Sequence, residues 1–402
     1  MKVKTLLLTL FLTIFLSTGS VFAAETVQAP NPVEVPDIRI VMDGRLERFE
    51  KVPVSVNNST MLPFRELLVK LGVPNDDGHI IYNHDKKSVT VWYGQTKIYL
   101  LIGQNEAFVN DEPISLNAAP ILYKGSTYVP LRFLAETMGK KVIWDGETRT
   151  VRICDAEKYE NVKKILDKSA EESAKVKKMK MDINMTGDLK SGDTNFDIAL
   201  DVSSLVDTLN KRMHIKAQAY VNELQISTEA YCADNSLYIL NPLLGSWSEM
   251  IFTDMEYSMM FEKQDGNIVI DNNDYLYTAL NQLDSKHDDE ILLSGNVYLY
   301  DLIEKVFAQQ GLDYAGDIGD DIEFDDLAVE ISINRDTYLM NYIKIDLKIT
   351  QRASGITDET AVNFSVKLAS NYDEDFTITV PEDVIENAVL IEDEIAVSPI
   401  YY

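Results

Sequence analysis

Residues 343–350 read Ile-Lys-Ile-Asp-Leu-Lys-Ile-Thr, an unbroken alternation of apolar and polar side chains. Because successive side chains of a β-strand point to opposite faces, this stretch predicts a strand with one apolar and one solvated face. The same alternation recurs in residues 180–186, 196–202, 362–368 and 376–380. Strands of a parallel sheet are apolar throughout, since helices cover both faces, so the alternation predicts an antiparallel sheet.

The apolar face of this sheet has to be covered. Segments 156–179, 273–283 and 298–310 have apolar residues at helical spacing and are the expected cover. The sequence therefore predicts an α+β fold in which a curved antiparallel sheet, a half-barrel, packs on helices over residues 154–388. Residues 389–402 are expected to form a C-terminal tail.

A duplicated pattern precedes the sheet. Residues 59–68, Ser-Thr-Met-Leu-Pro-Phe-Arg-Glu-Leu-Leu, recur at 126–135 as Ser-Thr-Tyr-Val-Pro-Leu-Arg-Phe-Leu-Ala. Each copy has Pro where a helix can start without losing a hydrogen bond, and Gly72 or Gly139 where the helix can end in a left-handed residue. An alternating hairpin pattern follows each helix, so the sequence predicts a duplicated β-α-β-β unit.

Arg65 and Arg132 occupy the same place in the two copies, just inside each helix. One interpretation makes them an anion clamp. We favour the other, in which the aliphatic stem covers the sheet and the guanidinium satisfies loop carbonyls. A duplicated position usually serves the duplicated fold.

The N-terminal segment has the features of a secretory signal peptide. Residues 1–23 begin with two lysines, continue with an apolar run at 5–16 and end on small side chains, with cleavage expected before Ala24. The run is shorter than a membrane-spanning helix needs, and an uncleaved anchor is the alternative. The protein is thus expected to be secreted, extracellular or cell-wall associated, with no transmembrane span after cleavage and with residues 24–36 as a linker.

Charge is distributed unevenly along the chain of 402 residues, whose formal net charge is −28. Residues 37–153 hold 14 acidic and 15 basic side chains, whereas residues 154–402 hold 49 and 20. This break predicts a domain boundary, and the excess of carboxylates argues against nucleic acid as a partner. The near-neutral part is the one expected to contact a cell-wall or envelope component, because anionic polymers repel the acidic part.

A set of spaced motifs identifies the first part by resemblance. The motifs are Ile102-Gly103, Val109-Asn110-Asp111, Ile114-Ser115-Leu116, Ala119-Pro120, residues 128–136 and Trp144-Asp145. With them, residues 37–153 resemble the copper amine oxidase N-terminal domain, or stalk domain, which occurs widely in secreted proteins of Gram-positive bacteria. The resemblance implies an accessory module that holds neither the copper nor the redox cofactor.

Histidine content argues against an oxidase. A copper site of that type needs three imidazoles and a processed Tyr, whereas the chain has four His in all, and His79 and His84 are expected to be exposed turn residues. No nucleophile elbow, phosphate loop or zinc spacing is present in the sequence. We therefore expect no cofactor and no enzyme.

Short cues in the second part also resemble a known class. They are an opening helix running into residues 179–187, Leu237-Tyr238-Ile239 followed by residues 246–250, the hairpin at 333–338 and the closing residues 380–384. Together they are similar to the lipoprotein-carrier superfamily of the LolA, LppX and LprG type. The resemblance implies a hydrophobic cavity between sheet and helices that accepts acyl chains.

Met and aromatic side chains suit an irregular apolar ligand. The residues expected to line the cavity are Tyr238, Trp247, Phe252, Met255, Met259, Met260 and Phe261. The plainer interpretation, which we favour, is that these side chains fill the core.

Two further features leave alternatives open. The acidic segment 313–326 is either a calcium site or a solvated loop, and its spacing does not fit an EF-hand, so the loop is preferred. Cys154 and Cys232 either pair or remain buried thiols, and we favour unpaired.

The leading hypothesis is a secreted, non-catalytic envelope protein whose stalk module presents an acidic LolA-like domain for binding or scaffolding. The alternative is a carrier or sensor of a hydrophobic ligand, a lipid or lipoprotein. A carrier needs an accessible apolar cavity, whereas a scaffold needs only a closed core and a docking surface.

Overall fold

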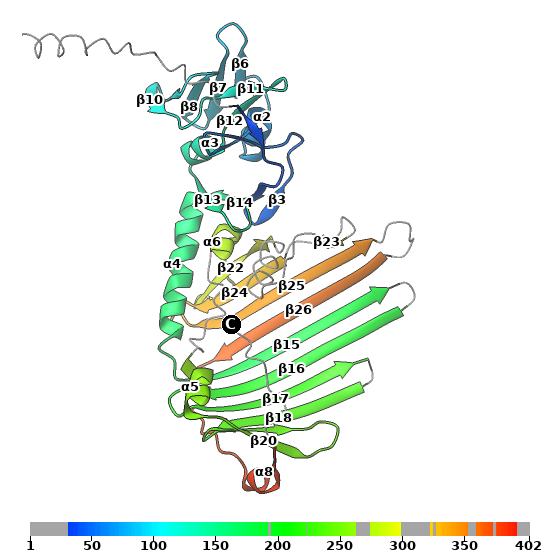
Figure 1. Ribbon diagram of the computed structural model, residues 1–402. Coiled ribbons are helices and arrows are strands. Elements are labelled where there is room, and N and C mark those ends of the chain that lie inside the picture. Colours follow the sequence, from blue (N-terminus) through cyan, green and yellow to red (C-terminus); the bar gives the residue numbers. More distant parts are fainter. Residues whose placement is uncertain are drawn as a thin grey trace, which may run out of the picture.

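The structure, a computed structural model, describes residues 31–191, 194–222, 224–262, 274–298, 322–324, 327–352, 359–372 and 375–391. They form a small module of three sheets and a large module built on one long sheet (Figure 1). Helix α4 (Ala156–Ser173) leads from the first module along the second. It begins at Asp155, whose side chain accepts hydrogen bonds from the backbone N–H groups of Glu157 and Lys158.

The small module, called the stalk module below, comprises residues 33–155. Its sheets have the strand orders β1-β4-β5-β12-β11, β10-β9-β8-β7-β6 and β13-β14-β2-β3. Its helices are α2 (Phe64–Lys70) and α3 (Leu131–Thr137). The strands are β1 (Val33–Glu34), β2 (Arg39–Met42), β3 (Arg45–Glu47), β4 (Val54–Val56), β5 (Ser59–Pro63), β6 (Ile80–Asn83), β7 (Ser88–Tyr93), β8 (Thr96–Leu101), β9 (Glu106–Val109), β10 (Glu112–Ser115), β11 (Ile121–Tyr123), β12 (Ser126–Pro130), β13 (Lys140–Asp145) and β14 (Thr150–Asp155).

The duplicated β-α-β-β unit is confirmed. One copy is β5-α2-β6-β7 and the other is β12-α3-β13-β14. Strands β5 and β12 pair antiparallel with Leu62 opposite Val129, which are equivalent positions of the repeat. A local two-fold axis therefore passes between these two residues.

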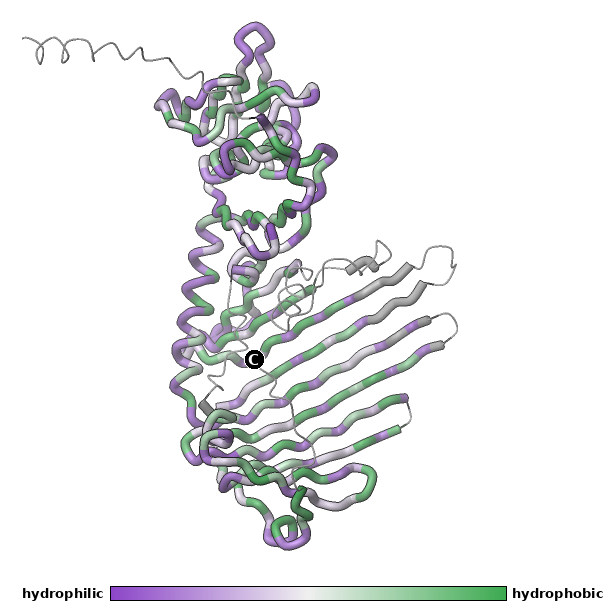
Figure 2. Tube along the Cα trace, in the orientation of Figure 1, coloured by the Kyte–Doolittle hydropathy of each residue, from purple (hydrophilic) through white to green (hydrophobic). Residues whose placement is uncertain are grey.

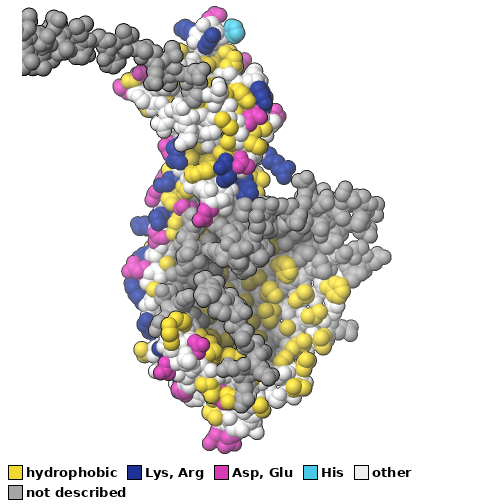
Figure 3. Space-filling model, in the orientation of Figure 1, with side chains coloured by type: hydrophobic (Ala, Val, Ile, Leu, Met, Phe, Trp, Pro, Cys, Tyr) yellow, Lys and Arg dark blue, Asp and Glu magenta, His cyan; other side chains and the backbone are white. Residues whose placement is uncertain are grey.

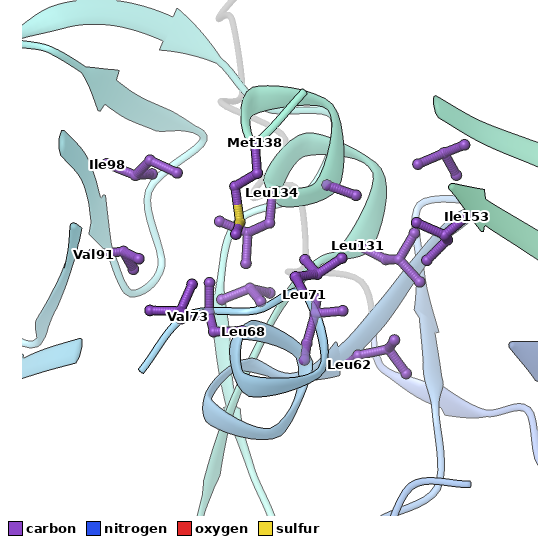
Figure 4. Packing of buried hydrophobic residues seen from close by; sticks show 14 of the residues in the cluster. Leu62, Leu68, Leu71, Val73, Val91, Ile98, Leu131, Leu134, Met138 and Ile153 are labelled. Carbon is purple, nitrogen blue, oxygen red and sulfur yellow. The ribbon is translucent and has the colours of Figure 1, made fainter. Parts of the chain in front are cut away.

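The core of the stalk module lies where the two repeated helices meet (Figure 4). Leu68 and Leu71 of the α2 region and Leu131 and Leu134 of α3 point toward one another, and each is at most 6% exposed. Both helices start directly after Pro, at Pro63 and Pro130, as the sequence predicts.

The large module is a 13-stranded sheet with the order β21-β22-β24-β25-β26-β15-β16-β17-β18-β19-β20-β27, and β23 pairs with β25. All pairs are antiparallel except β20 with β27. The other described helices are α5 (Asp254–Glu262), α6 (Asp274–Ala279) and α8 (Glu382–Asn387). The strands are β15 (Lys178–Ser191), β16 (Thr194–Asp207), β17 (Arg212–Val221), β18 (Leu224–Ala233), β19 (Ser236–Leu240), β20 (Trp247–Ile251), β21 (Leu280–Leu283), β22 (Glu290–Val297), β23 (Ile322–Phe324), β24 (Leu327–Asn334), β25 (Met340–Arg352), β26 (Glu359–Asn371) and β27 (Val389–Leu390).

The strand register keeps the apolar side chains on one face. Opposed residues of an antiparallel pair share a face, and Ile343, Leu368, Ile183, Val202 and Ala217 lie opposite one another across five strands. The hydropathy of the chain alternates along these strands accordingly (Figure 2). The predicted α+β fold with a curved sheet is confirmed (Figure 1).

Three predicted elements differ from the structure. The helix expected at 273–283 ends at Ala279, because Leu280 begins a strand that pairs with Gly295 of β22. Residues 376–380 are not a strand, since their carbonyls accept side-chain hydrogen bonds instead. The helix expected at 156–179 ends at Ser173, and the segment 299–310 lies outside the described residues.

The two modules meet at a buried junction. The Arg152 guanidinium lies 3.8 Å from the centre of the Tyr275 ring and is 2% exposed. The Tyr275 hydroxyl donates to Asp145 Oδ2 at 3.1 Å. Gly44 approaches Asn296 so closely that a Cβ there would overlap the Asn296 carbonyl oxygen.

We expect Gly44→Ala to destabilise the protein more than Gly94→Ala. Both glycines have positive φ, +81° and +57°, so both substitutions carry a backbone cost of about 1 kcal/mol. Only at Gly44 does the added methyl meet backbone atoms, whereas Gly94 has nothing within 4 Å. The extra cost at Gly44 is about 1–3 kcal/mol. Thermal unfolding followed by circular dichroism measures the difference, and equal losses in Tm would contradict the close junction.

Candidate functional site

The middle of the large sheet carries an apolar face that is only partly covered. Strands β25, β26, β15, β16 and β17 build it, and their register places apolar side chains on it side by side. These are Ile343, Ile345, Leu347, Phe364, Val366, Leu368, Met181, Ile183, Met185, Ile198, Leu200, Val202, Ile215, Ala217 and Ala219. Every one of them is half-buried or exposed. We call this surface the open apolar face.

Both ends of the same side of the sheet are buried. At one end, Ile331 of β24 and Leu293 of β22 are 2% and 0% exposed and cluster with Val162 of α4. At the other end, Cys232 of β18 is 1% exposed and packs against Phe261 of α5. Hydrophobic side chains gather between these ends on the visible surface of the sheet (Figure 3). Among the described residues, the helices therefore cover the ends of the sheet, while the side chains at its centre are only half-buried or exposed.

The opposite side of the same strands is polar, and its side chains bond to one another. Asn184 Nδ2 donates to Asp201 Oδ1 at 2.8 Å, and Lys344 Nζ lies 2.8 Å from Asp346 Oδ2. A hollow of about 720 Å³ near the far strand ends is lined mostly by residues of this side, such as Asp188, with Ile198, Leu347 and Phe364 as further lining residues. The two sides of the sheet thus offer separate chemistry.

Three of the expected lining residues lie at one covered end. Phe252 and two residues of α5, Met260 and Phe261, belong to one cluster with Cys232. Phe261 is 6% exposed, so it acts as core and not as an accessible wall. The structure brings these three together, at the margin of the open apolar face.

The other expected lining residues are not part of that group. Tyr238 and Trp247 cluster with Tyr231, which lies on the polar side of the sheet. Met255 and Met259 of α5 are exposed, at 68% and 46%. The seven residues therefore do not form one cavity.

The sequence analysis did not single out the residues of the open apolar face. The alternation of apolar and polar side chains marks them in the sequence. The expected lining residues were chosen because they are Met or aromatic. Such side chains are as common in a protein core, such as the one at α5, as in a ligand site.

A polar network supports the sheet where α8 packs. His214 Nε2 lies 2.7 Å from Glu229 Oε1, and the His214 ring stacks on Tyr231 at 4.2 Å. Burial acts to raise the pKa of Glu229, but hydrogen bonds with His214 and Tyr231 outweigh it and lower that pKa. Burial and the bond to Glu229 raise the pKa of Tyr231 to about 12. These groups are bound to one another and serve the packing of α8.

Arg65 and Arg132 follow the interpretation favoured from the sequence. Arg65 Nη2 donates to the Ile80 carbonyl at 3.5 Å, and Arg132 Nη1 donates to the Val142 carbonyl at 2.9 Å. The two carbonyls occupy equivalent positions of the two hairpins. Both guanidinium groups thus satisfy backbone carbonyls as expected, but these carbonyls belong to strands β6 and β13 and not to loops.

No group of three or more His, Cys, Asp or Glu in the described part of the chain could hold a metal ion. His84 is exposed, and His79 is half-buried with its Nδ1 2.8 Å from Asp76 Oδ1. The acidic segment 313–326 falls outside the described residues except for β23. Among the helices that the structure describes, none combines the length and the apolar composition needed to cross a membrane.

Family models match both halves of the chain. Residues 41–153 match the copper amine oxidase N-terminal domain, and residues 161–389 match a family of unknown function, DUF6612. The chain belongs to the DUF6612 family. The stalk module thus carries the accessory domain that the sequence resembles, and the large sheet carries the DUF6612 segment.

Solved structures similar to the DUF6612 segment include proteins of the class that the sequence resembles. LprF from Mycobacterium bovis is 12% identical, with 55% of this chain and 97% of that chain covered and a TM-score of 0.29. A domain described as an outer membrane lipoprotein-sorting protein from Vibrio parahaemolyticus is 11% identical, with coverage of 56% and 96% and a TM-score of 0.20. A DUF1329 family protein from Desulfovibrio piger is 10% identical, with coverage of 54% and 95% and a TM-score of 0.17. Similarities with TM-scores this low carry no weight for function, and no curated protein matches the chain.

Both cysteines of this DUF6612 protein are free and buried, as favoured from the sequence. Burial raises the pKa of Cys154 to about 12 and that of Cys232 to about 11. Only the thiolate reacts readily, so at pH 8 neither thiol is reactive in the folded chain.

We expect a thiol reagent such as 5,5′-dithiobis(2-nitrobenzoate) to leave the native protein unlabelled at pH 8 and to modify two thiols per chain in guanidinium chloride. Cys232→Ala lowers the denatured count to one. A denatured count of zero before reduction and two after it would reveal a disulfide and contradict the structure.

Proposed function

We propose that the protein is an exported, non-catalytic binder of hydrophobic ligands, and that the open apolar face of the large sheet takes an acyl chain. The observation that carries this proposal is that the apolar side chains named for that face are half-buried or exposed, between two ends that are buried. Large contiguous apolar surfaces on a folded protein usually mark a site that binds a ligand or a partner.

The size of the hydrophobic effect supports an acyl ligand. Burying about ten methylenes gains roughly 8 kcal/mol, which exceeds the smaller estimates of the cost of association. A strand of 14 residues such as β15 is about 45 Å long, so an acyl chain fits along or across the sheet. Met181 and Met185 on the face are unbranched and adapt to ligands of irregular shape.

The carrier explains the open apolar face better than the scaffold does. A scaffold needs a closed core, and in that case the central strands would be as buried as Leu293 and Ile331, at 0% and 2%. The side chains of the open apolar face are half-buried or exposed instead. The stalk module can still present the ligand-binding domain, since the junction around Arg152 fixes one module on the other.

The domain plan that goes with this function has residues 1–23 as a signal peptide and 24–36 as a linker. Residues 37–153 are the stalk domain, 154–388 the ligand-binding domain and 389–402 a tail, whose first residues join the large sheet as β27. The protein acts outside the membrane, secreted or held at the cell wall. Its carboxylate excess opposes adsorption to anionic lipid surfaces, which suits a carrier that takes up single ligand molecules.

The test places one negative charge on either side of the same strand. Met185 lies on the open apolar face and the adjacent Thr186 on the polar side. We expect Met185→Glu to weaken binding of the uncharged probe N-phenyl-1-naphthylamine at least tenfold, because binding would bury an unpaired carboxylate. Thr186→Glu leaves the affinity within about twofold of wild type. Fluorescence titration measures both, with circular dichroism to establish folding.

A third variant separates charge from volume. Ala217→Trp adds bulk without charge on the same face and is expected to reduce probe capacity. Mass spectrometry of an organic extract should identify acyl species in wild type and less in Met185→Glu. A wild-type protein that neither binds the probe nor yields acyl species would refute the proposal.

A further inference from the structure

The stalk module contains two hollows, one beside each repeated helix. The hollow beside α2 has a volume of about 770 Å³ and is lined by Arg65 of its own repeat and by Ser126 and Thr127 of the other. The hollow beside α3 has a volume of about 650 Å³ and is lined by Arg132 with residues 59–60. Each hollow therefore combines a helix start from one repeat with a strand start from the other.

The two hollows are equivalent sites. The local two-fold axis between Leu62 and Val129 exchanges the repeats, and with them the contributions to each hollow. Arg65 bonds to the Ile80 carbonyl in one, and Arg132 bonds to the Val142 carbonyl in the other. The duplication has thus produced a pair of hollows, each of which is built from residues of both repeats.

An exposed aromatic ring stands at the same place in both. Tyr82 lines the first hollow and Trp144 the second, and each follows the Arg-bonded carbonyl by two residues on its hairpin. Their exposures are 40% and 44%. Both copies thus keep a flat ring partly in water at the same place beside a hollow, although its chemical type differs.

The surroundings of the rings identify a ligand class. Hydroxyl groups of Ser126 and Thr127, the Asn75 amide and the Glu50 carboxylate line the first hollow beside Tyr82. Asn58 and Asn117 line the second beside Trp144. An apolar ring edged by many hydrogen-bonding groups complements a pyranose, which has an apolar face and hydroxyl groups at its rim.

We propose that these two hollows are glycan-binding sites, in which Tyr82 and Trp144 each stack on a sugar ring. Two sites on one rigid module engage two points of a glycan mesh, so avidity exceeds the affinity of a single site. The near-neutral charge of residues 37–153, with 14 acidic and 15 basic side chains, permits approach to a glycan that carries acidic groups. This function is separate from hydrophobic-ligand binding by the large sheet.

The experiment uses the full chain, with chitohexaose, cellohexaose and hexagalacturonate as soluble probes and purified peptidoglycan sacculi as the polymer. Isothermal titration calorimetry should give two sites per chain for at least one hexasaccharide. Tyr82→Ala and Trp144→Ala should each reduce the number to one, and the double variant to none. Retention on sacculi should fall more than tenfold in each single variant, because avidity is lost.

Trp92→Ala is the matched control. Trp92 is 39% exposed on β7 and is absent from the walls of both hollows, so its loss should change neither stoichiometry nor retention. The double variant should still bind N-phenyl-1-naphthylamine, which shows that it is folded and separates this inference from the proposed function. The inference is overturned if no hexasaccharide binds, if the double variant binds as wild type does, or if Trp92→Ala loses as much.

Discussion

The structure depends on a register that holds the apolar side chains of many strands on one side of the large sheet. Ile183 lies opposite Leu368 on one neighbouring strand and opposite Val202 on the other. A slip of one residue would turn Lys180, Asp182 and Asn184 toward the helices, and burial of unpaired charges would cost more than the sheet gains. The register is therefore strongly specified, and the covered ends and the open centre both follow from it.

A second constraint joins the two modules. Arg152 is among the largest fully buried side chains, and its guanidinium lies against Tyr275 while the Tyr275 hydroxyl reaches Asp145. Removing one partner from such a buried polar group is costly, since it leaves another unsatisfied. The junction is therefore specific in orientation. It joins the stalk module to the end of the large module (Figure 1).

The sequence predicted those elements whose signal is local. Alternation within single strands and repeated Pro and Gly positions were sufficient for the sheet and for the duplicated unit. Residues 280–283 form a strand because they pair with β22. This partner lies outside the segment, so the local sequence does not predict the strand. At 376–380, bonds from Lys178 and Arg212 replaced the strand pairing that alternation implied.

The sequence could not show on which side of the sheet the expected lining residues lie, for a related reason. Tyr231 and Cys232 are neighbours in β18, yet they belong to different clusters on opposite sides of the sheet. Tyr238 pairs with Tyr231, whereas Leu237 pairs with Cys232, so only the register shows that Tyr238 and Phe261 are separated. Composition indicates a hydrophobic region of the sequence. Assigning a residue to one side of the sheet requires its cross-strand partner, which the sequence does not give.

An open apolar face favours association between chains, and the charge of the same module opposes it. Carboxylates outnumber basic side chains by 49 to 20 in residues 154–402, and like charge keeps separate chains apart. At its two edges the sheet ends in short strands, β21 and β27, which offer few unpaired backbone groups to another sheet. Repulsion and short edges act at the perimeter and leave the centre of the sheet free of charge. A small apolar molecule can thus reach the open apolar face, whereas a second folded chain is repelled. The proposed ligand binding depends on this difference between a small ligand and a whole chain.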